Sequence, residues 1–369
     1  MLLIQADRDA LLKPLTTVTG IVERRHTMPI LSNVLISKQG NVLSFLATDL
    51  EIQITCEQAI EGNGPDFQFT ASAKKFQDIL RAIPEHATVC IESADGRLTI
   101  RSGKSRFNLQ TLPAEDFPKL AIENSPRVPI TLPHSLLKNL LSKVQYAMAH
   151  QDIRYYLNGL FIIVDGNNLK LVATDGHRLA FCASNLDVEL DRHETILPRK
   201  TITELYKLLS DSDNPLHIEF GKNQVQFKFG SITIHSKVVD GKFPDYNRVI
   251  PTTNERIIAL DRVQLTQALQ RAAILSNEKF RGVRFLLSPG SLKIVCNNSE
   301  QEEAQEELEI SYDYSTLDIG YNIGYLLDVL NNIDAETLLF AFGEQATTST
   351  LVTIPDNPDF KYVVMPMRI

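Results

Sequence analysis

One group of residues recurs three times along this chain of 369 residues at nearly equal spacing. Thr174 begins the run Thr-Asp-Gly-His-Arg, Thr48 begins the similar Thr-Asp-Leu-Glu, and Asn297 begins a weaker match, Asn-Asn-Ser-Glu. These positions are 126 and 123 residues apart, and one third of the chain is 123 residues. A regular period of this length predicts three copies of one structural unit, each of ordinary domain size.

Each third also repeats the same succession of predicted elements. Apolar residues at helical spacing predict two helices per third. The second helices start at Ser72, Pro198 and Asn322, which are 126 and 124 residues apart, so the period holds at an independent landmark. Pro14 leaves the start of the first helix open, because proline is unfavourable inside a helix. The predicted helices cover residues 7–22, 72–83, 133–148, 198–209, 261–275 and 322–333.

Alternating apolar residues predict about six strands per third, joined mainly as hairpins. Two of the predicted hairpin turns are Gln39-Gly40-Asn41 and Asp165-Gly166. Because hairpins give antiparallel sheets, we expect an α+β fold with three repeated domains, each an antiparallel sheet with two helices on one face. The expected domains are residues 1–124, 128–250 and 251–369.

The composition is that of a soluble globular protein, with 43% hydrophobic and 22% charged residues. No apolar run approaches the roughly 20 residues that span a bilayer, and no signal peptide is visible, so we expect no membrane partner and a cytoplasmic location. The four cysteines are scattered without metal-ligand spacing, which indicates reduced structural thiols. We expect neither a metal site nor a cofactor.

Asp175 and His177 are the main candidates for catalysis, for example in a hydrolase. Acid–base chemistry requires two side chains that converge in space, and sequence adjacency does not show this. The related run at Thr48 keeps Thr-Asp without the histidine, which favours a turn with local backbone hydrogen bonds. The sequence therefore indicates that the protein is not an enzyme. A repetitive scaffold that binds only proteins remains a third possibility.

The charge of the chain is unevenly distributed. The net charge is −8, yet the predicted helices together are slightly basic, so the strands and loops carry the acidic excess. A basic helical layer suits non-specific contact with phosphates while an acidic exterior repels nucleic acid. Solvated helix faces would give the same pattern, and charge alone does not separate the two interpretations.

Several long stretches carry a resemblance to a known family. They include M-P-I-L-S-N, R-F-N-L-Q-T-L-P-A-E-D-F-P, A-H-Q-D-I-R-Y-Y-L-N-G, A-T-D-G-H-R-L-A, D-G-K-F-P-D-Y, A-I-L-S-N-E-K-F-R-G-V-R and Y-V-V-M-P-M-R. Over its full length the chain resembles the bacterial DNA polymerase III beta subunits, or sliding clamps. The resemblance implies a processivity factor that forms a head-to-tail homodimeric ring of six domains, with helices lining a hole around duplex DNA. The implied protein partners are the polymerase alpha subunit, the clamp loader, translesion polymerases, ligase and mismatch-repair proteins.

The resemblance also implies a hydrophobic groove for partner peptides. Ile369 stands where the family has leucine, a conservative departure. Arg178 and Arg248 are expected at the rim, whereas core packing is the alternative for the apolar members. The groove residues are Leu157, Thr174, Gly176, His177, Arg178, Leu179, Pro244, Arg248, Val249, Val363, Val364, Met365, Pro366, Met367 and Arg368.

Two further surfaces follow from the resemblance. For the tyrosines of the DNA surface, half-buried packing at a domain edge is the alternative. The residues expected to face DNA are Arg24, Lys74, His150, Gln151, Arg154, Tyr155 and Tyr156. Opposite charge near the two ends of the chain suits a head-to-tail dimer contact with an apolar centre. Its expected residues are Lys74, Lys104, Arg106, Phe107, Leu109, Ile274, Leu275, Glu300, Glu303 and Glu306.

Overall fold

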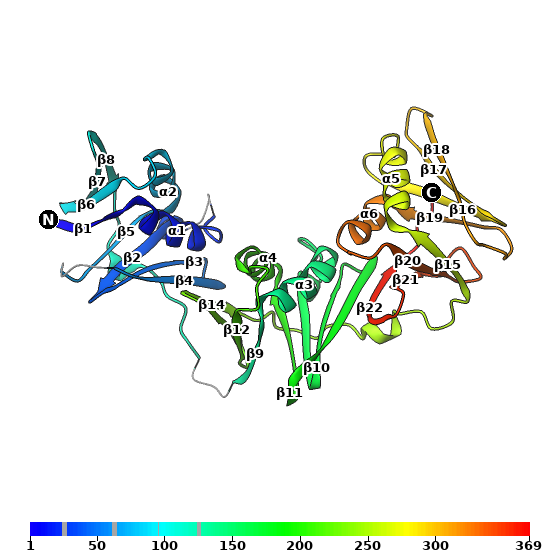
Figure 1. The fold of residues 1–369 in the computed structure, drawn as a ribbon, viewed down its shortest axis with the longest axis horizontal. Helices are drawn as coiled ribbons and strands as arrows, with labels where there is room; N and C mark the ends of the chain where they lie inside the picture. The colour runs from blue at the N-terminus through cyan, green and yellow to red at the C-terminus, as the bar shows by residue number, and fades with distance from the viewer. Residues whose placement is uncertain (24–27, 61–64, 95, 124–126) are drawn as a thin grey trace. The chain divides into compact units, whose positions relative to one another are not determined.

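The structure is a computed structural model that describes residues 1–23, 28–60, 65–94, 96–123 and 127–369 (Figure 1). The chain forms two compact units, and each is described by itself. The first unit is Met1–Ser135 with Thr203–Val238, and the second is Leu136–Ile202 with Val239–Ile369. In the described part of the chain, no helix has the length and apolar character needed to cross a membrane.

In its described residues, the first unit contains helices α1 and α2 and two antiparallel sheets, with strand orders β1-β6-β7-β8 and β5-β2-β3-β4-β14-β13-β12-β9. Its elements are β1 (Leu2–Asp7), α1 (Arg8–Thr19), β2 (Asn33–Gln39), β3 (Val42–Thr48), β4 (Ile52–Ala59), β5 (Phe67–Ser72), α2 (Ala73–Ala82), β6 (Thr88–Ala94), β7 (Arg97–Ser102), β8 (Ser105–Gln110), β9 (Val128–Pro133), β12 (Pro215–Phe220), β13 (Gln224–Phe229) and β14 (Ile232–Lys237). Two helices, α3 (His134–Val144) and α4 (Arg199–Leu208), have residues in both units.

The second unit also has two antiparallel sheets, with orders β10-β11-β22-β21-β20-β15 and β18-β17-β16-β19. Its elements are β10 (Gly159–Thr174), β11 (Arg178–Pro198), β15 (Arg256–Asp261), α5 (Arg262–Ala273), β16 (Gly282–Ser288), β17 (Ser291–Asn297), β18 (Glu303–Glu309), β19 (Leu317–Asn322), α6 (Ile323–Asn331), β20 (Thr337–Phe342), β21 (Thr350–Ile354) and β22 (Asn357–Val364). Short 3₁₀ turns include Gln145–Ala147, Tyr155–Leu157 and Tyr246–Arg248.

Helix α1 shows why the helices form and where they pack. Asp7 caps its N-terminus by accepting a hydrogen bond from the Asp9 amide at 2.8 Å. Leu11, Leu15 and Val18 recur at helical spacing and are buried. The helix packs on β3, β4 and α2, while α2 packs on β2 and β5, so both helices cover one face of that sheet (Figure 1). In the second unit, α5 and α6 likewise pack together, α5 against β17 and β18, and α6 against β19.

The α+β fold with antiparallel sheets is confirmed, and all six helices lie where they were predicted, within a few residues. The strands were under-counted, because the first repeat alone has eight. The hairpin turn predicted at Asp165-Gly166 is wrong. Strand β10 continues through Gly166 with two register shifts, and the hairpin closes later, between Thr174 and Arg178. The left-handed backbone of Gly166 (φ +59°) serves a bulge within the strand.

Strand pairing between repeats explains why three repeats form two compact units. Strand β14 pairs with β4, with Ile234 opposite Ile54, so part of the middle repeat extends a sheet of the first. Strand β11 pairs with β22, with Leu179 opposite Val363, so the rest of the middle repeat extends a sheet of the third. This sharing of strands was not visible in the sequence period.

Candidate functional site

The segment between β10 and β11 is a tight turn held by its own side chains. Asp175 Oδ1 accepts hydrogen bonds from the amides of His177 (2.9 Å) and Arg178 (3.0 Å). Thr174 Oγ1 accepts from the Gly176 amide at 3.1 Å and donates to the Arg178 carbonyl at 2.6 Å. Gly176 has φ +88°, which favours glycine. The turn is therefore fixed before any ligand arrives.

The related turn of the first repeat has the same hydrogen bonds. Asp49 Oδ1 accepts from the amides of Glu51 and Ile52, both at 2.9 Å, and Thr48 Oγ1 accepts from the Leu50 amide at 3.0 Å. Thr48 Oγ1 also donates to the Ile52 carbonyl at 2.9 Å. The interpretation of Thr-Asp as a turn motif is confirmed.

The same geometry removes the case for catalysis at Asp175. One of its oxygens serves the turn, and the other accepts from Arg178 Nε at 3.1 Å. Among the contacts described for these residues, Asp175 meets His177 through its backbone amide, and the imidazole takes no part. A carboxylate committed to backbone and guanidinium groups does not orient a general base.

The turn lies beside the C-terminal end of the chain. Arg178 pairs with Val364 and Leu179 with Val363 where β11 meets β22. Beyond the strand, the Met365 amide donates to the His177 carbonyl at 2.9 Å. Leu157, Leu179 and Val363 belong to one hydrophobic cluster, against which Val249 packs. The structure thus brings predicted groove residues from distant parts of the sequence to one place.

Burial divides the predicted groove residues into two groups. Leu157, Thr174, Arg178, Leu179, Val363 and Val364 are buried. Gly176, Val249, Met365, Pro366 and Met367 are half-buried, and His177, Pro244, Arg248 and Arg368 are exposed. Core packing is therefore the observed state of the first group, whereas the remaining residues are accessible at the surface.

One groove prediction is wrong. Arg178 was expected at the rim, but its side chain is only 9% exposed. Its Nη1 lies 2.5 Å from Asp328 Oδ2, and its Nη2 donates to the Tyr146 carbonyl at 2.6 Å. Burial alone would lower the pKa of Arg178, but the surrounding Tyr362, Asp328 and Asp175 raise it, so the group stays charged. Asp328, which the sequence prediction missed, lies on α6, and its only sequence signal was the helical periodicity around it.

Arg248 does lie at the surface, 86% exposed, and its Nε forms an ion pair with Asp245 at 3.0 Å. The other half of the rim prediction therefore agrees with the structure. An exposed pair of this kind contributes little to stability, so its guanidinium is free to exchange partners.

The predicted DNA-facing residues of the middle repeat lie on the loop before β10. His150, Gln151, Arg154 and Tyr155 are exposed, and Tyr156 is half-buried. Arg154 pairs with Asp152 at 2.8 Å, and this hydrogen bond lowers the pKa of Asp152 to about 2. Arg154 also donates to the Asp175 carbonyl at 3.0 Å. The loop is therefore attached to the Thr-Asp turn.

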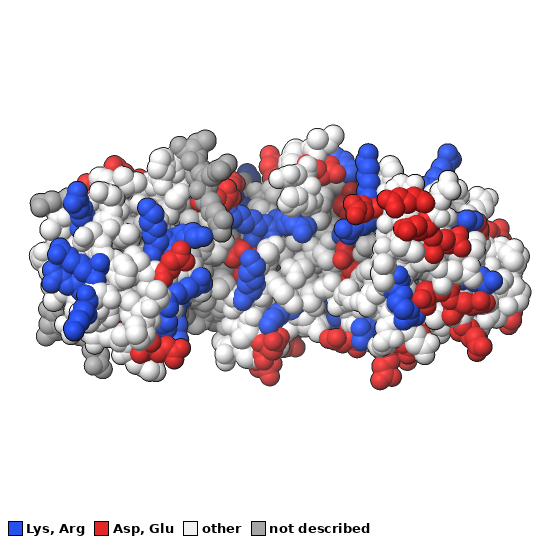
Figure 2. Space-filling model, turned by 90° about the horizontal axis from the view of Figure 1, so that it is seen from above, with Lys and Arg blue, Asp and Glu red and all other residues white. Residues whose placement is uncertain are grey.

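Lys74 lies in the first unit, where α1 and α2 border a hollow of about 640 Å³. Lys75 and Arg81, which the sequence prediction missed, line the same hollow. Figure 2 shows lysine and arginine side chains gathered on this part of the first unit. Arg24, also predicted to face DNA, lies outside the described residues.

Most of the predicted dimer residues lie on or beside two edge strands and one helix end, whereas Lys74 lies on α2. Strand β8 is the last strand of its sheet and carries Arg106, Phe107 and Leu109, with Lys104 just before it. Strand β18 is the last strand of another sheet and carries Glu303 and Glu306. Lys104 and Arg106 are exposed, Phe107 and Leu275 are half-buried, and Leu109 is buried. Ile274, at the end of α5, is 78% exposed. Glu300 is exposed in the turn before β18.

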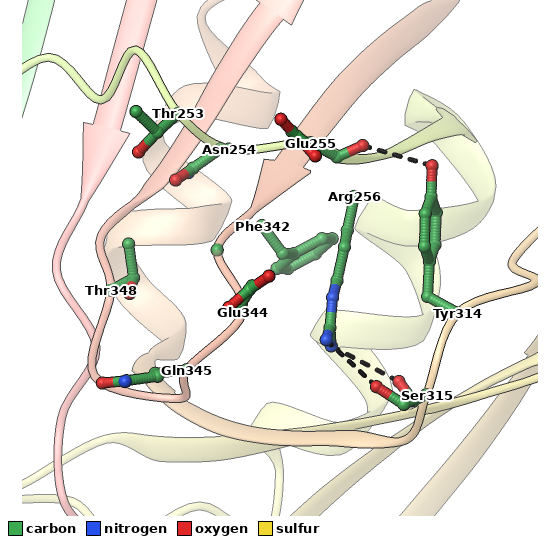
Figure 3. A pocket seen from close by; sticks show the side chains of 11 residues that line it. Thr253, Asn254, Glu255, Arg256, Tyr314, Ser315, Phe342, Glu344, Gln345 and Thr348 are labelled. Carbon is green, nitrogen blue, oxygen red and sulfur yellow. Dashed lines mark hydrogen bonds between the residues drawn. The ribbon is translucent and has the colours of Figure 1, made fainter.

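A polar cavity of about 670 Å³ lies elsewhere in the second unit, between the start of β15 and the turn after β20 (Figure 3). The Tyr314 hydroxyl donates to the Glu255 carbonyl at 3.2 Å, and Arg256 bonds to Ser315 at 3.0 Å. None of the predicted site residues lines it.

In the described part of the chain, one group of side chains has metal-type donors close together, namely Asp7, Asp9 and His86. The Arg8 guanidinium already binds Asp9 at 2.5 Å, and Asp7 caps α1. A neighbouring cation and the positive helix end both oppose a bound metal ion, so we assign none.

Comparison with known proteins gives consistent matches along the whole chain. Models of the DNA polymerase III beta subunit match as an N-terminal domain over residues 2–121, a central domain over 131–245 and a C-terminal domain over 247–368. A beta sliding clamp of Pseudomonas aeruginosa is 46% identical over 366 residues, covering 98% of each chain. The beta sliding clamp of Escherichia coli K12 is 43% identical over 363 residues, covering 98% of this chain and 99% of that one. A crystal structure of a Pseudomonas aeruginosa sliding clamp with ligand is similar with TM-score 0.94 and 44% identity over the full length of both chains.

Proposed function

This chain belongs to the DNA polymerase III beta subunit family, the beta sliding clamps, and we propose that it holds the polymerase on DNA by closing into a ring around the duplex. It is a non-catalytic processivity subunit that associates with DNA polymerase III and with DNA. The details of assembly, DNA contact and partner docking are proposals, and each rests on a different surface.

The ring is a head-to-tail homodimer in which β8 of one protomer pairs with β18 of the other. Both strands are the outermost of their sheets, and an uncovered strand edge is a template for pairing with another chain. Arg106 on β8 and Glu303 on β18 give the edges opposite charge, which fixes which edge meets which. The exposed Ile274 supplies an apolar contact at the centre.

Two surfaces that carry cationic side chains meet DNA without reading its sequence. One is the hollow with Lys74, and the other is the loop with His150, Gln151, Arg154, Tyr155 and Tyr156. Arg24, which lies outside the described residues, is assigned to DNA contact by family resemblance alone. Long side chains contact phosphates weakly and identically at every sequence, so retention on DNA comes from enclosure. Three domains, residues 1–124, 128–250 and 251–369, supply each half of the ring, and the protein works in the cytoplasm.

Partner peptides dock where β11 meets β22. The half-buried Met365 and Met367 suit this role, since flexible thioether side chains adapt to Leu and Phe anchors of different peptides. The partners are the polymerase alpha subunit, the clamp loader, translesion polymerases, ligase and mismatch-repair proteins. A tether of this kind raises the effective concentration of each enzyme at DNA even when its own contact is modest.

The observation that carries this proposal is the hydrogen bond from the Met365 amide to the His177 carbonyl, which joins the two halves of the docking surface. Deleting residues 365–369 removes several contacts at once, at a cost of about 2–4 kcal/mol in peptide binding, or roughly thirty- to a thousandfold. The deletion leaves β8 and β18 untouched, so the dimer persists.

The test combines native mass measurement, calorimetry and a processivity assay. A synthetic peptide from the C-terminal tail of the alpha subunit binds the intact dimer and loses binding to the truncated dimer, which no longer supports processive synthesis. Asp165→Asn is the matched control, because it removes an exposed pair with Arg192 in the same unit and leaves residues 365–369 in place. Equal peptide affinity in the truncated and intact dimers would show that the docking surface is assigned wrongly.

A further inference from the structure

Arg178 is buried one residue away from the exposed His177, and it joins three parts of the second unit. Its Nε binds Asp175 Oδ2 at 3.1 Å within the turn. Its Nη2 donates to the Tyr146 carbonyl at 2.6 Å, in the short 3₁₀ turn after α3. Its Nη1 lies 2.5 Å from Asp328 Oδ2 on α6. Each arm of the guanidinium thus has its own partner, and only an arginine presents that fork.

Helix α6 holds this guanidinium with two residues one turn apart. Asp328 provides the carboxylate, and the ring centroid of Tyr325, three residues earlier, lies 4.4 Å from the guanidinium carbon of Arg178. The Tyr325 carbonyl in turn accepts a hydrogen bond from the Tyr362 hydroxyl at 2.9 Å. Tyr362 lies on β22, two residues before the end of that strand. The α6 contacts therefore reach both strands of the docking surface.

The backbone of Arg178 connects the buried guanidinium to the turn and to β22. Its carbonyl accepts from Thr174 Oγ1, its amide binds Asp175, and the residue pairs with Val364 in the sheet. The preceding carbonyl, that of His177, accepts the Met365 amide at 2.9 Å. Anchoring the Arg178 side chain fixes the acceptor that holds Met365.

We propose that Asp328 and Arg178 are positioning residues for partner peptides, acting from beneath the docking surface to hold His177 and Met365 in the binding geometry. The proposal rests on the proposed function of that surface. Neither side chain needs to touch the peptide. The affinity for the peptide is higher because a surface that is already ordered loses less conformational entropy on binding.

The expected effect follows from exposure. Arg178 is 9% exposed and Asp328 is 45% exposed, so water partly replaces a lost carboxylate. Asp328→Asn therefore weakens peptide binding about three- to tenfold, less than the deletion of residues 365–369. Arg178→Lys keeps the charge but loses the fork, and weakens binding about tenfold.

The experiment measures the affinity of the alpha-subunit tail peptide by calorimetry and the exchange rate of the Met365 amide by NMR. We expect Asp328→Asn to weaken peptide binding and to speed hydrogen exchange of the Met365 amide. The control Asp165→Asn removes an exposed pair with Arg192 in the same unit, 3.1 Å apart, and changes neither. In the double variant, Arg178→Lys weakens peptide binding less than it does alone, because both changes disrupt the same Arg178–Asp328 interaction.

Two results would overturn the inference. One is Asp328→Asn with wild-type peptide affinity. The other is weaker binding with an unchanged Met365 amide, since the effect would then reach the peptide by another route. If Arg178→Lys does not fold, the comparison of Asp328→Asn with Asp165→Asn still tests the proposal. A wild-type protein that fails to bind the peptide overturns the proposed function itself, which separates the two failures.

Discussion

Gly320 offers a way to displace the C-terminal residues without removing any of them. It lies in β19, and its carbonyl accepts a hydrogen bond from the Met367 amide at 2.8 Å. A Cβ added at Gly320 would lie 2.5 Å from the Met367 carbonyl oxygen and 2.8 Å from Ile369 Cδ1. Because the nearer atom belongs to the backbone, the change Gly320→Ala pushes the last residues of the chain away from β19.

The magnitude follows from the hydrogen bond and the packing that this displacement disturbs. The Met367 hydrogen bond contributes about 0.5–1.5 kcal/mol, and overpacking costs about 1–3 kcal/mol. If the tail stays in place, the free energy of unfolding falls by an amount in this range. If the tail detaches, the overpacking is relieved. Detachment removes the ordered positions of Met365 and Met367. We expect peptide binding to weaken by about 1.4–2.8 kcal/mol, roughly ten- to a hundredfold. The dimer survives, because β19 and β18 are opposite edges of their sheet.

Gly282→Ala is the matched control. Its Cβ would lie 3.1 Å from the same Ile369 Cδ1, and the nearest atoms all belong to the Ile369 side chain, none of them to the backbone. It should therefore change peptide affinity less than twofold. Calorimetry with the alpha-subunit tail peptide, together with native mass measurement, compares the two variants. Wild-type affinity in Gly320→Ala, or equal losses in both variants, would refute the reasoning that the tail must rest on β19.

Three further predictions address assembly, DNA and acid stability. Ile274→Ala with Leu275→Ala removes the apolar centre of the dimer contact and gives a folded monomer by native mass measurement; a dimer at low micromolar concentration contradicts this. A ring loaded on a nicked circle stays bound in salt that abolishes direct DNA binding and leaves once the circle is cut, whereas equal loss from circular and linear DNA refutes enclosure. Burial lowers the pKa values of His134 and His235, so the unfolded chain binds protons first as the pH falls below about 6.5. The melting temperature therefore falls between pH 7 and pH 5, with a smaller fall in His235→Asn; an unchanged slope in that variant assigns the effect elsewhere.

The sequence predicted what depends on local pattern. The helices were placed because each has an apolar stripe at helical spacing, as in Leu11, Leu15 and Val18 of α1. Strand β11 was largely missed, although Leu186, Val188 and Leu190 alternate with acidic residues in its outer half. That half, from Asn185 to Glu194, is charged and mostly exposed, which is also typical of a loop. Its inclusion in a sheet comes from pairing with β10, a contact between distant residues. The extra length of β10 was also missed. Glycine is favoured both in a β-bulge and in a hairpin turn, so Gly166 alone did not distinguish the two.

The candidate site was predictable as a set of residues but not as a set of roles. Family resemblance grouped Arg178 with Arg248, yet one is buried and the other is 86% exposed. The difference arises from Asp328, which is 150 residues away in the chain. Nothing in the local pattern around Arg178 distinguishes an arginine that faces solvent from one that meets a distant carboxylate.

The two Thr-Asp turns share their hydrogen bonds but differ in the residue that ends each turn. In both, the threonine hydroxyl donates to the carbonyl four residues later, which belongs to Ile52 in the first repeat and to Arg178 in the second. Ile52 is a buried core residue, so that turn ends in the core. Arginine at the equivalent position cannot be buried without partners, and it finds them in Asp328 and Asp175. The two repeats therefore share the backbone geometry of the turn. The second repeat has arginine where the first has isoleucine, and this arginine binds α6. The preceding residue, His177, accepts the Met365 amide and so connects the turn to the end of the chain.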